Sequence, residues 1–459
     1  MNPVTKEARN LSHKRLLELI ETKQAVVGVL GMGYVGFPLA LECVNKGYNV
    51  IGFDRNSEKV SLLKDGHSHI RDVDDSQLKE ALHTERFQVS ENMSLIEHCD
   101  IIVICVPTPL NKKDKIPDLS YIDSAVDTML AYGISYIDSA VDTMLAYGRP
   151  NQLLILESTT YPGTTKQKIA DRMAAGRQVN IGSDFFIAYS PERIDPGNSH
   201  YEVADIPKVV GGMTRTCTKL ASAFYNTIVT SIHPVTSPEV AETAKLLENT
   251  YRYVNIALIN EMALNCRELD IDIWEVINAA DTKPFGFQKF SPGPGVGGHC
   301  IPIDPFYFKW IANQKGLQTK LIDLADEINS EMPFSVSDYA MKLVDKEHCN
   351  ILLIGAAYKK NTNDSRESSA FAIIDDLMKK GCTIDYYDPF ISEICLEDGS
   401  IKHSVPFTKE QINQYDVVII HTDHDDINYS ILQDTAPIIF DTRNICREKM
   451  ADNAKLITL

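Results

Sequence analysis

The chain has 459 residues, which is too long for one hydrophobic core and indicates two or three domains. Hydrophobic residues make up 44% and charged residues 24% of the sequence, as in ordinary folded proteins, so the composition excludes a disordered chain. The formal net charge of −18 argues against nucleic acid or an anionic membrane as the main partner, while leaving room for local basic pockets that bind phosphate.

Ten cysteines occur without a Cys-x-x-Cys pair or regular spacing, and several, such as Cys105, stand in apolar runs. This is typical of reduced thiols in a cytoplasmic protein, and it predicts neither a disulfide framework nor a metal site. The first residues lack the apolar core of a secretory signal. Glycines interrupt the longest apolar window, residues 26–44, so we expect no transmembrane segment and no membrane partner.

A short helix is expected over residues 9–22, and a dinucleotide-binding pattern follows it. An apolar strand enters Gly31-x-Gly33-x-x-Gly36, a helix follows, and a second strand ends at Asp54. In this context the glycines allow a tight turn, the approach of a pyrophosphate and close packing of helix on strand. Asp54 stands where an acid binds ribose hydroxyls, so NAD is favoured over NADP, although the adjacent Arg55 could accept a 2′-phosphate.

The alternation of strands and helices continues through further strands, expected over residues 100–106, 153–157 and 184–189. Val106-Pro107-Thr108 follows the first of these, at the edge where an α/β sheet presents its ligand loops. A simple turn stabilised by proline is the alternative for that segment.

Residues 119–133 and 134–148 are near copies, LSYIDSAVDTMLAYG and ISYIDSAVDTMLAYG. One copy makes a complete crossover helix, with Ser120 as its N-cap and Gly133 as its stop. A single duplication is too short for a repeat fold. We interpret the second copy as an insertion at a surface helix, without a function of its own.

From Ser237 the pattern predicts one long helix. Ser237-Pro238 is a helix start, and neither glycine nor proline recurs through residue 269, a length of about 50 Å. Polar side chains share one stripe of this helix: Glu242, Lys245, Asn249 and Tyr253. Either Lys245 and Asn249 point together into a cleft, or the stripe is a solvated face, which is the simpler interpretation of the stripe alone.

Residues 290–308, FSPGPGVGGHCIPIDPFYF, predict a loop of fixed path, neither helix nor central strand, because four glycines and four prolines surround Cys300 and Asp304. A thiol beside glycines can reach an electrophile. The alternative is a small hydrophobic side chain in a turn.

Pro333 marks the expected boundary of a second α/β series, with strands over residues 350–355, 383–387, 417–421 and 438–441. Lys359, Lys360 and Arg366 cluster after the first of these strands, and Arg443 follows the last. Basic residues at this edge suit an anionic ligand such as a nucleotide diphosphate.

The motifs GMGYVG, STTYPGTT, YSPERIDPG, KLLENTYRYVNIALINE, GVGGHCIPIDP and KKNTNDSRES resemble the UDP-glucose/GDP-mannose dehydrogenase family along nearly the whole chain. The resemblance implies oxidation of a sugar C6 alcohol to a carboxylate with two NAD. It implies that Cys300 captures the C6 aldehyde as a thiohemiacetal, which becomes a thioester, and that Lys245 stabilises negative charge on the C6 oxygen.

Asn249 and Asp304 match residues of the family that order water and proton transfers. Glu192 matches an acid–base residue in thioester hydrolysis, and Thr159 matches a threonine at the catalytic water. The implied cofactor contacts are Gly31, Gly33, Tyr34, Val35, Gly36, Asp54, Arg55, Val106, Pro107, Thr108 and Thr159. The implied substrate contacts are Glu192, Arg193, Lys245, Asn249, Phe290, Gly293, Gly297, His299, Lys359, Arg366 and Arg443.

The resemblance also predicts the domain order of an α/β protein with two Rossmann-like doubly wound domains. An N-terminal helical extension (residues 1–22) precedes the NAD-binding domain (23–232). A long central helix and a small helical domain with the Cys300 loop (233–332) join it to a C-terminal UDP-sugar-binding α/β domain (333–459). Because family members assemble through the long helix, a homodimer or larger homo-oligomer is implied.

The substrate is indicated by departures from the UDP-glucose dehydrogenase pattern. This chain reads GGHCIPID and SPERIDPG, where those enzymes usually carry GGSCFPKD and SPEFLREG. The variants resemble the branch acting on UDP-N-acetylhexosamines for surface polysaccharide precursors, and most of all enzymes acting on UDP-N-acetylglucosamine. The galacto and manno epimers and UDP-glucose stay open. His299 either contacts the sugar or merely packs, and packing is slightly favoured.

Two other classes of function remain as alternatives. A two-electron β-hydroxyacid dehydrogenase also has a Rossmann domain and a long helix with a lysine, but it lacks the Cys300 loop and the second α/β domain. A non-catalytic regulator that binds NAD or a UDP-sugar would not need Cys300, Lys245, Asn249 and Asp304 together. NADH formation from NAD and a UDP-sugar separates these alternatives.

Overall fold

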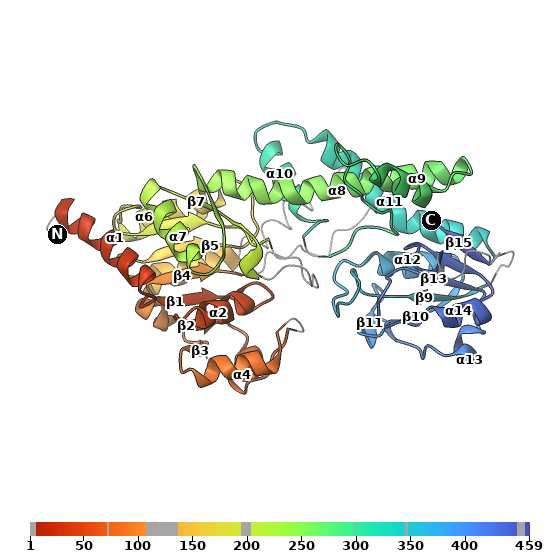
Figure 1. Ribbon diagram of the computed structural model, residues 1–459, viewed down its shortest axis with the longest axis horizontal. Coiled ribbons are helices and arrows are strands. Elements are labelled where there is room, and N and C mark those ends of the chain that lie inside the picture. Colours follow the sequence, from red (N-terminus) through yellow and green to blue (C-terminus); the bar gives the residue numbers. More distant parts are fainter. Residues whose placement is uncertain are drawn as a thin grey trace. The chain divides into compact units, whose positions relative to one another are not determined.

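The computed structural model describes residues 6–70, 73–106, 136–193, 203–298, 300–344, 348–447 and 455–459 (Figure 1). The chain divides into two compact units. Unit 1 comprises residues 1–248 and 307–317, and unit 2 comprises residues 249–306 and 318–459. Each unit contains one large sheet, which confirms the prediction of two Rossmann-like α/β domains. In the described part of the chain, no helix is long and apolar enough to cross a membrane.

Over the described residues, the sheet of unit 1 has eight strands in the order β3-β2-β1-β4-β5-β6-β7-β8. Neighbouring strands pair in parallel except β6 and β7, which pair antiparallel. The strands are β1 (Val26–Leu30), β2 (Asn49–Phe53), β3 (Phe87–Ser90), β4 (Ile101–Ile104), β5 (Leu153–Leu156), β6 (Phe186–Tyr189), β7 (Lys208–Gly212) and β8 (Ile232–Val235).

One helix, α1 (Lys6–Glu21), precedes β1. The other helices described before β8 lie between strands, as the alternating pattern predicts. They are α2 (Gly36–Asn45), α3 (Ser57–Lys64), α4 (Asp75–His83), a helix over residues 136–147, α6 (Asp171–Arg177) and α7 (Arg215–Asn226). Short turns of other helical types are η1 (Met93–His98), η3 (Thr165–Ala170) and η4 (Val203–Asp205).

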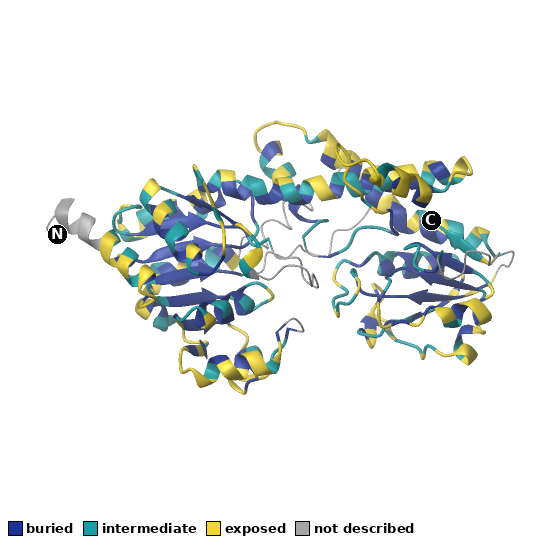
Figure 2. Ribbon diagram, in the orientation of Figure 1, coloured by how far each residue is buried: buried dark blue, intermediate teal, exposed yellow. Residues whose placement is uncertain are grey.

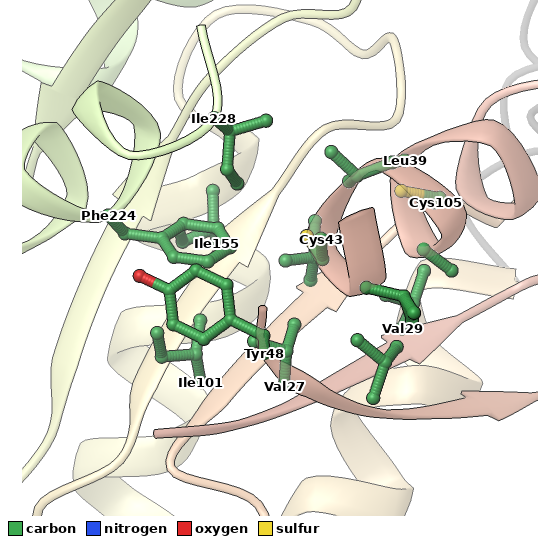
Figure 3. Packing of buried hydrophobic residues seen from close by; sticks show 14 of the residues in the cluster. Val27, Val29, Leu39, Cys43, Tyr48, Ile101, Cys105, Ile155, Phe224 and Ile228 are labelled. Carbon is green, nitrogen blue, oxygen red and sulfur yellow. The ribbon is translucent and has the colours of Figure 1, made fainter. Parts of the chain in front are cut away.

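Alternate residues of the central strands point to two different hydrophobic cores. Ile101 and Val103 of β4 belong to one core, and Ile102 and Ile104 belong to the other. The first core packs strand residues against α2 and α7, including Phe224 (Figure 3). Because both faces of this mainly parallel sheet are covered, the central strands β4 and β5 are buried along their length (Figure 2). Their residues are therefore apolar throughout rather than alternating.

The second copy of the duplicated segment packs into the core, which corrects our interpretation of it as a surface insertion. Residues 136–147 are helical, and Ile137, Val141 and Met144 on this helix are fully buried. Arg172 of α6 donates to Asp138 of the same copy at 2.8 Å. The first copy lies outside the described residues. The second copy is therefore a packed crossover helix between β4 and β5.

Over the described residues, the sheet of unit 2 has five strands, in the order β10-β9-β13-β14-β15, and every neighbouring pair is parallel. A separate antiparallel pair is formed by β11 and β12. The strands are β9 (Asn350–Ile354), β10 (Thr383–Tyr387), β11 (Glu393–Cys395), β12 (Ile401–His403), β13 (Val417–Ile420), β14 (Ile439–Asp441) and β15 (Leu456–Thr458).

The long helix predicted from Ser237 is confirmed as α8 (Pro238–Glu268), which has 31 residues and contributes to both units. At the expected boundary, Pro333, the helix α11 (Lys320–Lys342) continues through the proline without a break. The remaining helices of the described chain are α9 (Ile273–Asp281), α10 (Asp304–Asn313), α11 (Lys320–Lys342), α12 (Ser369–Lys379), α13 (Lys409–Ile412) and α14 (Ser430–Thr435).

Candidate active site

The glycine-rich turn after β1 has the geometry that a dinucleotide phosphate requires. Gly31 has φ of +98°, and a Cβ there would lie 2.5 Å from the carbonyl oxygen of Cys105. A Cβ on Gly36 would lie 2.0 Å from the Gly31 oxygen, whereas one on Gly33 would meet nothing within 4 Å. The helix α2 starts at Gly36, and no side chain caps its first turn. These residues fit a pyrophosphate held by N–H groups at a helix N-terminus.

Asp54 follows β2 and is held as an anion beside this turn. One carboxylate oxygen accepts hydrogen bonds from the Met32 N–H at 3.0 Å and from the Lys59 ammonium at 2.8 Å. Burial raises the pKa of Asp54, but Lys59 and the backbone N–H groups outweigh it, so the pKa is lowered on balance. Arg55 is exposed, as is Tyr34 in the turn, and Val35 precedes the start of α2.

The ends of β4 and β5 are joined by a hydrogen bond. The Ser158 hydroxyl donates to the carbonyl oxygen of Val106 at 2.7 Å. Thr159, the next residue, is half-buried at this edge of the sheet. Pro107 and Thr108 lie outside the described residues. In this unit the structure therefore gathers the turn after β1, Asp54, Val106 and Thr159 at the carboxyl ends of parallel strands, the edge where such sheets bind ligands.

The polar stripe of α8 is buried, so the interpretation of it as a solvated face is wrong. The exposed fractions of Glu242, Lys245, Asn249 and Tyr253 are 0%, 9%, 6% and 2%. Over the described residues, no carboxylate lies within ion-pair distance of the Lys245 ammonium. An ammonium in such surroundings suits an oxygen that becomes negatively charged during a reaction.

Glu242 links α8 to the loop after β5. Its carboxylate accepts hydrogen bonds from the Gly163 N–H at 2.6 Å, the Thr165 N–H at 2.9 Å and the Thr165 hydroxyl at 2.7 Å. Burial raises the pKa of this carboxyl group. Nearby, Arg193 pairs with Glu248 of α8 at 2.7 Å.

Replacing Glu242 with alanine is expected to lower the free energy of unfolding by about 3 kcal/mol, because three buried donors lose their acceptor. Glu261→Ala is the matched control, since Glu261 is an exposed glutamate of the same helix, and it should change stability by about 0.5 kcal/mol or less. Denaturant unfolding followed by circular dichroism measures both changes. Equal losses in the two variants would contradict the anchoring role of Glu242.

Cys300 stands in a turn that leads into α10. Its carbonyl oxygen accepts hydrogen bonds from the N–H groups of Ile303 at 3.0 Å and Asp304 at 2.8 Å. The helix begins at Asp304, so our prediction of a loop through residue 308 is wrong at its end. Cys300 itself is half-buried, in contrast to most of the other cysteines, which are buried.

Asn249 and Asp304 form a buried pair beside this turn. The Asn249 side-chain amide donates to the Asp304 carboxylate, and the two residues are 6% and 1% exposed. A fixed carboxylate and amide of this kind can hold a water molecule or pass a proton. The structure thus brings Cys300, Asn249 and Asp304 together within unit 2.

The glycines before Cys300 pack against the C-terminal domain. A Cβ on Gly297 would lie 2.7 Å from the carbonyl oxygen of Glu367, and one on Gly298 would lie 2.7 Å from the Tyr358 ring. The Gly298 N–H donates to the carbonyl oxygen of Arg366 at 3.2 Å. Close packing of the backbone therefore fixes the path of the loop that carries the thiol. His299 lies outside the described residues.

The basic residues expected to cluster in unit 2, among them Lys359, Arg366 and Arg443, have different surroundings. Arg443 is half-buried, and its guanidinium donates to the carbonyl oxygen of His421 at 2.6 Å and would lie 2.7 Å from a Cβ on Gly293. Burial lowers the pKa of Arg443. Arg366 pairs with Asp364 at 2.6 Å, and Lys359 is half-buried. Arg443 and Gly293 are thus brought together, whereas Arg366 has a local partner.

Phe290 lies at the start of the Cys300 loop, with its ring centroid 5.8 Å from that of Tyr251 on α8. No group of His, Cys, Asp and Glu side chains in the described part of the chain could hold a metal ion.

Family models match this chain in three consecutive segments. They are the NAD binding domain (residues 25–229), the central domain (239–331) and the UDP binding domain (352–448) of the UDP-glucose/GDP-mannose dehydrogenase family. The chain belongs to this family. The resemblance of its motifs is therefore confirmed, as are the NAD cofactor and the nucleotide-sugar class of substrate.

Relatives within the family differ in the sugar that they are named for. A UDP-N-acetyl-D-mannosamine dehydrogenase of Methanococcus maripaludis is 33% identical, covering 92% of this chain and 93% of its own. A UDP-N-acetyl-D-glucosamine 6-dehydrogenase of Pseudomonas aeruginosa is 32% identical, covering 94% and 99%. The solved structure of a UDP-D-ManNAc dehydrogenase from Pyrococcus horikoshii is 30% identical, with a TM-score of 0.79 over 94% of this chain and 98% of its own.

Proposed function

We propose that this enzyme oxidises UDP-N-acetyl-D-glucosamine at C6 to the uronic acid, as a precursor for surface polysaccharide. The observation that carries the proposal is the half-buried Cys300 thiol in a turn fixed by close-packed glycines, beside the buried Asn249–Asp304 pair. A two-electron dehydrogenase has no use for such a thiol, whereas a four-electron oxidation needs a nucleophile that keeps the aldehyde bound.

The proposed reaction assigns one role to each residue. NAD, when bound, accepts a hydride in each of the two oxidations. The Lys245 ammonium stabilises the negative oxygen at C6. The Cys300 sulfur adds to the aldehyde carbon and forms a thiohemiacetal, whose oxidation leaves a thioester. Asn249 and Asp304 order the proton transfers and water.

Hydrolysis completes the proposed reaction. Glu192 takes a proton from the water that attacks the thioester carbon, and Thr159 helps to place that water. The bond between carbon and the Cys300 sulfur then breaks, which releases the carboxylate product and returns the thiol.

The substrate proposal rests on the GGHCIPID and SPERIDPG variants and on the Pseudomonas aeruginosa relative. The manno epimer is the second candidate, because relatives named for UDP-N-acetyl-D-mannosamine match at similar identity. We further propose a cytoplasmic homodimer or larger homo-oligomer. Exposed apolar side chains on α8, such as Leu247, Leu258 and Met262, support assembly through this helix.

NADH formation from the UDP derivatives of GlcNAc, ManNAc, GalNAc and glucose tests the function. We expect about two NADH per sugar consumed, with the highest kcat/KM for UDP-N-acetylglucosamine. A higher kcat/KM for UDP-N-acetylmannosamine would transfer the assignment to the manno epimer. One NADH per sugar would refute the four-electron reaction, and no NADH with any sugar would favour a regulator.

A further inference from the structure

The reversed strand β7 brings a buried lysine to the edge of the sheet where β5 and β6 end. Ala188 and Tyr189 of β6 pair with Gly212 and Gly211 of β7 in an antiparallel register. Continuing this register places Lys208, the first residue of β7, opposite Glu192. The side chain of Lys208 is 4% exposed, so it is an almost fully buried cation.

Lys208 is shared between two carboxylates. Its ammonium lies 2.8 Å from an oxygen of Glu192 and 2.9 Å from an oxygen of Glu157, which follows β5. The side chains of Glu192 and Glu157 are 12% and 0% exposed. Lys208 therefore connects the slightly exposed carboxylate of Glu192 to the carboxylate of Glu157, which solvent does not reach.

The second oxygen of Glu192 is also held. It accepts a hydrogen bond from the N–H of Arg193 at 2.6 Å, while the Arg193 guanidinium pairs with Glu248. One oxygen is thus fixed by the backbone and the other by Lys208. These two donors constrain the orientation of the Glu192 carboxylate.

Burial and neighbouring charges affect the pKa of each ionisable group around Lys208. Burial lowers the pKa of Lys208, but attraction to Glu157 and Glu192 outweighs this and raises the pKa, so Lys208 is charged. Burial raises the pKa of Glu157 and of three nearby groups, Cys43 of α2, Cys105 after β4 and Tyr225 of α7. The Tyr225 hydroxyl donates to Glu157. These thiols and the phenol are therefore neutral neighbours of the ionic group.

We infer that Lys208 is a positioning residue for Glu192: it orients this carboxylate and favours its ionised form, while Glu157 moderates the effect by sharing the ammonium. The inference rests on the proposed role of Glu192 in thioester hydrolysis. A base must be ionised to take a proton from water, so hydrolysis slows as the pH falls through the pKa of Glu192. Removing Lys208 and removing Glu157 should therefore shift the pKa of Glu192 in opposite directions.

The test compares the pH dependence of thioester hydrolysis in Lys208→Met and Glu157→Gln, followed by intact-protein mass in single turnovers. Lys208→Met removes the cation, so the acid limb is expected to move to higher pH by about 1–2 units. Glu157→Gln removes the carboxylate that competes with Glu192 for the Lys208 ammonium, so the acid limb is expected to move to lower pH. Lys219→Met, at an exposed lysine of α7, is the control and should leave the profile unchanged.

Lys208→Met leaves two carboxylates without their cation and could prevent folding. The double variant Lys208→Met/Glu157→Gln removes one charge of each sign and replaces the single variant in that case. NAD binding and thermal unfolding show whether each variant is folded. In the double variant the Glu192 carboxylate still lacks its cation, so the acid limb is again expected above that of the wild type.

The variant Glu192→Gln tests the proposed role of Glu192 separately from the inference about Lys208. If this variant hydrolyses the thioester at the wild-type rate, the proposed role of Glu192 fails and the inference about Lys208 fails with it. If the variant accumulates the acyl-enzyme but the Lys208 and Glu157 variants keep the wild-type acid limb, only the inference about Lys208 is overturned. A structural role alone predicts lower stability without these opposed shifts.

Discussion

Replacing Cys300 with alanine is expected to reduce formation of the uronic acid by at least about a thousandfold, because the proposed mechanism needs this nucleophile to hold the aldehyde for the second oxidation. Cys300→Ser should be nearly as inactive, since a hydroxyl ionises far less readily than a thiol and is a much weaker nucleophile than a thiolate. Both changes are small and lie in a half-buried turn, so the fold should be retained.

The measurement counts NADH and product per UDP-N-acetylglucosamine consumed, with intact-protein mass to detect the acyl-enzyme. Cys395→Ala is the matched control, because Cys395 is an exposed free cysteine of the same unit, and it should keep wild-type turnover. A Cys300→Ala enzyme that still forms two NADH per sugar would refute the covalent mechanism. If the wild type and Cys300→Ala each form one NADH per sugar consumed, the enzyme is a two-electron dehydrogenase.

Sequence patterns predicted correctly those strands, turns and helices that depend on residues close together in the chain. The strand, glycine turn and helix from residue 26 to residue 45 follow from apolar periodicity and from the close contact that only a glycine allows at residue 36. The helix α8 follows from its Ser-Pro start and from the absence of later breakers. The start of α10 was missed although Asp304-Pro305 carries a signal, since an acid followed by proline is typical of a helix N-terminus.

Other features depend on tertiary packing that the sequence does not express. The two copies of the duplicated segment have nearly the same local preferences, so only packing shows that the second copy covers the sheet. Burial of the α8 stripe likewise depends on partners far along the chain, such as Thr165 for Glu242. The sequence did not single out Lys208, because its contact with Glu192 depends on the antiparallel direction of β7, and no sequence motif predicts that direction.

The two α/β domains also differ in a way that only side-chain contacts reveal. Asp388 follows β10 as Asp54 follows β2, and its carboxylate likewise accepts N–H groups of the turn after the first strand, those of Ala356 and Ala357. However, the buried His424 lies 3.1 Å from the same oxygen of Asp388. The oxygen that meets the turn is thus contacted by a buried histidine in the second domain and by the Lys59 ammonium in the first.

Lys245→Met is expected to lower kcat by about 10²–10³-fold, because in the proposed mechanism this buried cation stabilises the oxygen that becomes negative during oxidation at C6. Methionine has a similar length and keeps the packing of the stem, so NAD binding and thermal stability should change little. Lys245→Arg is the matched variant, since it keeps the charge but presents a planar group where a point charge is needed. It should recover only part of the activity.

The division between kcat and KM tests whether Lys245 acts on the transition state. An interaction made only there lowers kcat and kcat/KM by the same factor and leaves KM unchanged. An increase of KM with unchanged kcat would instead make Lys245 a residue that binds the ground-state sugar. The expected equal loss follows from the charges involved: the C6 hydroxyl of the substrate is neutral, and the full attraction of a buried ammonium develops only as that oxygen gains negative charge.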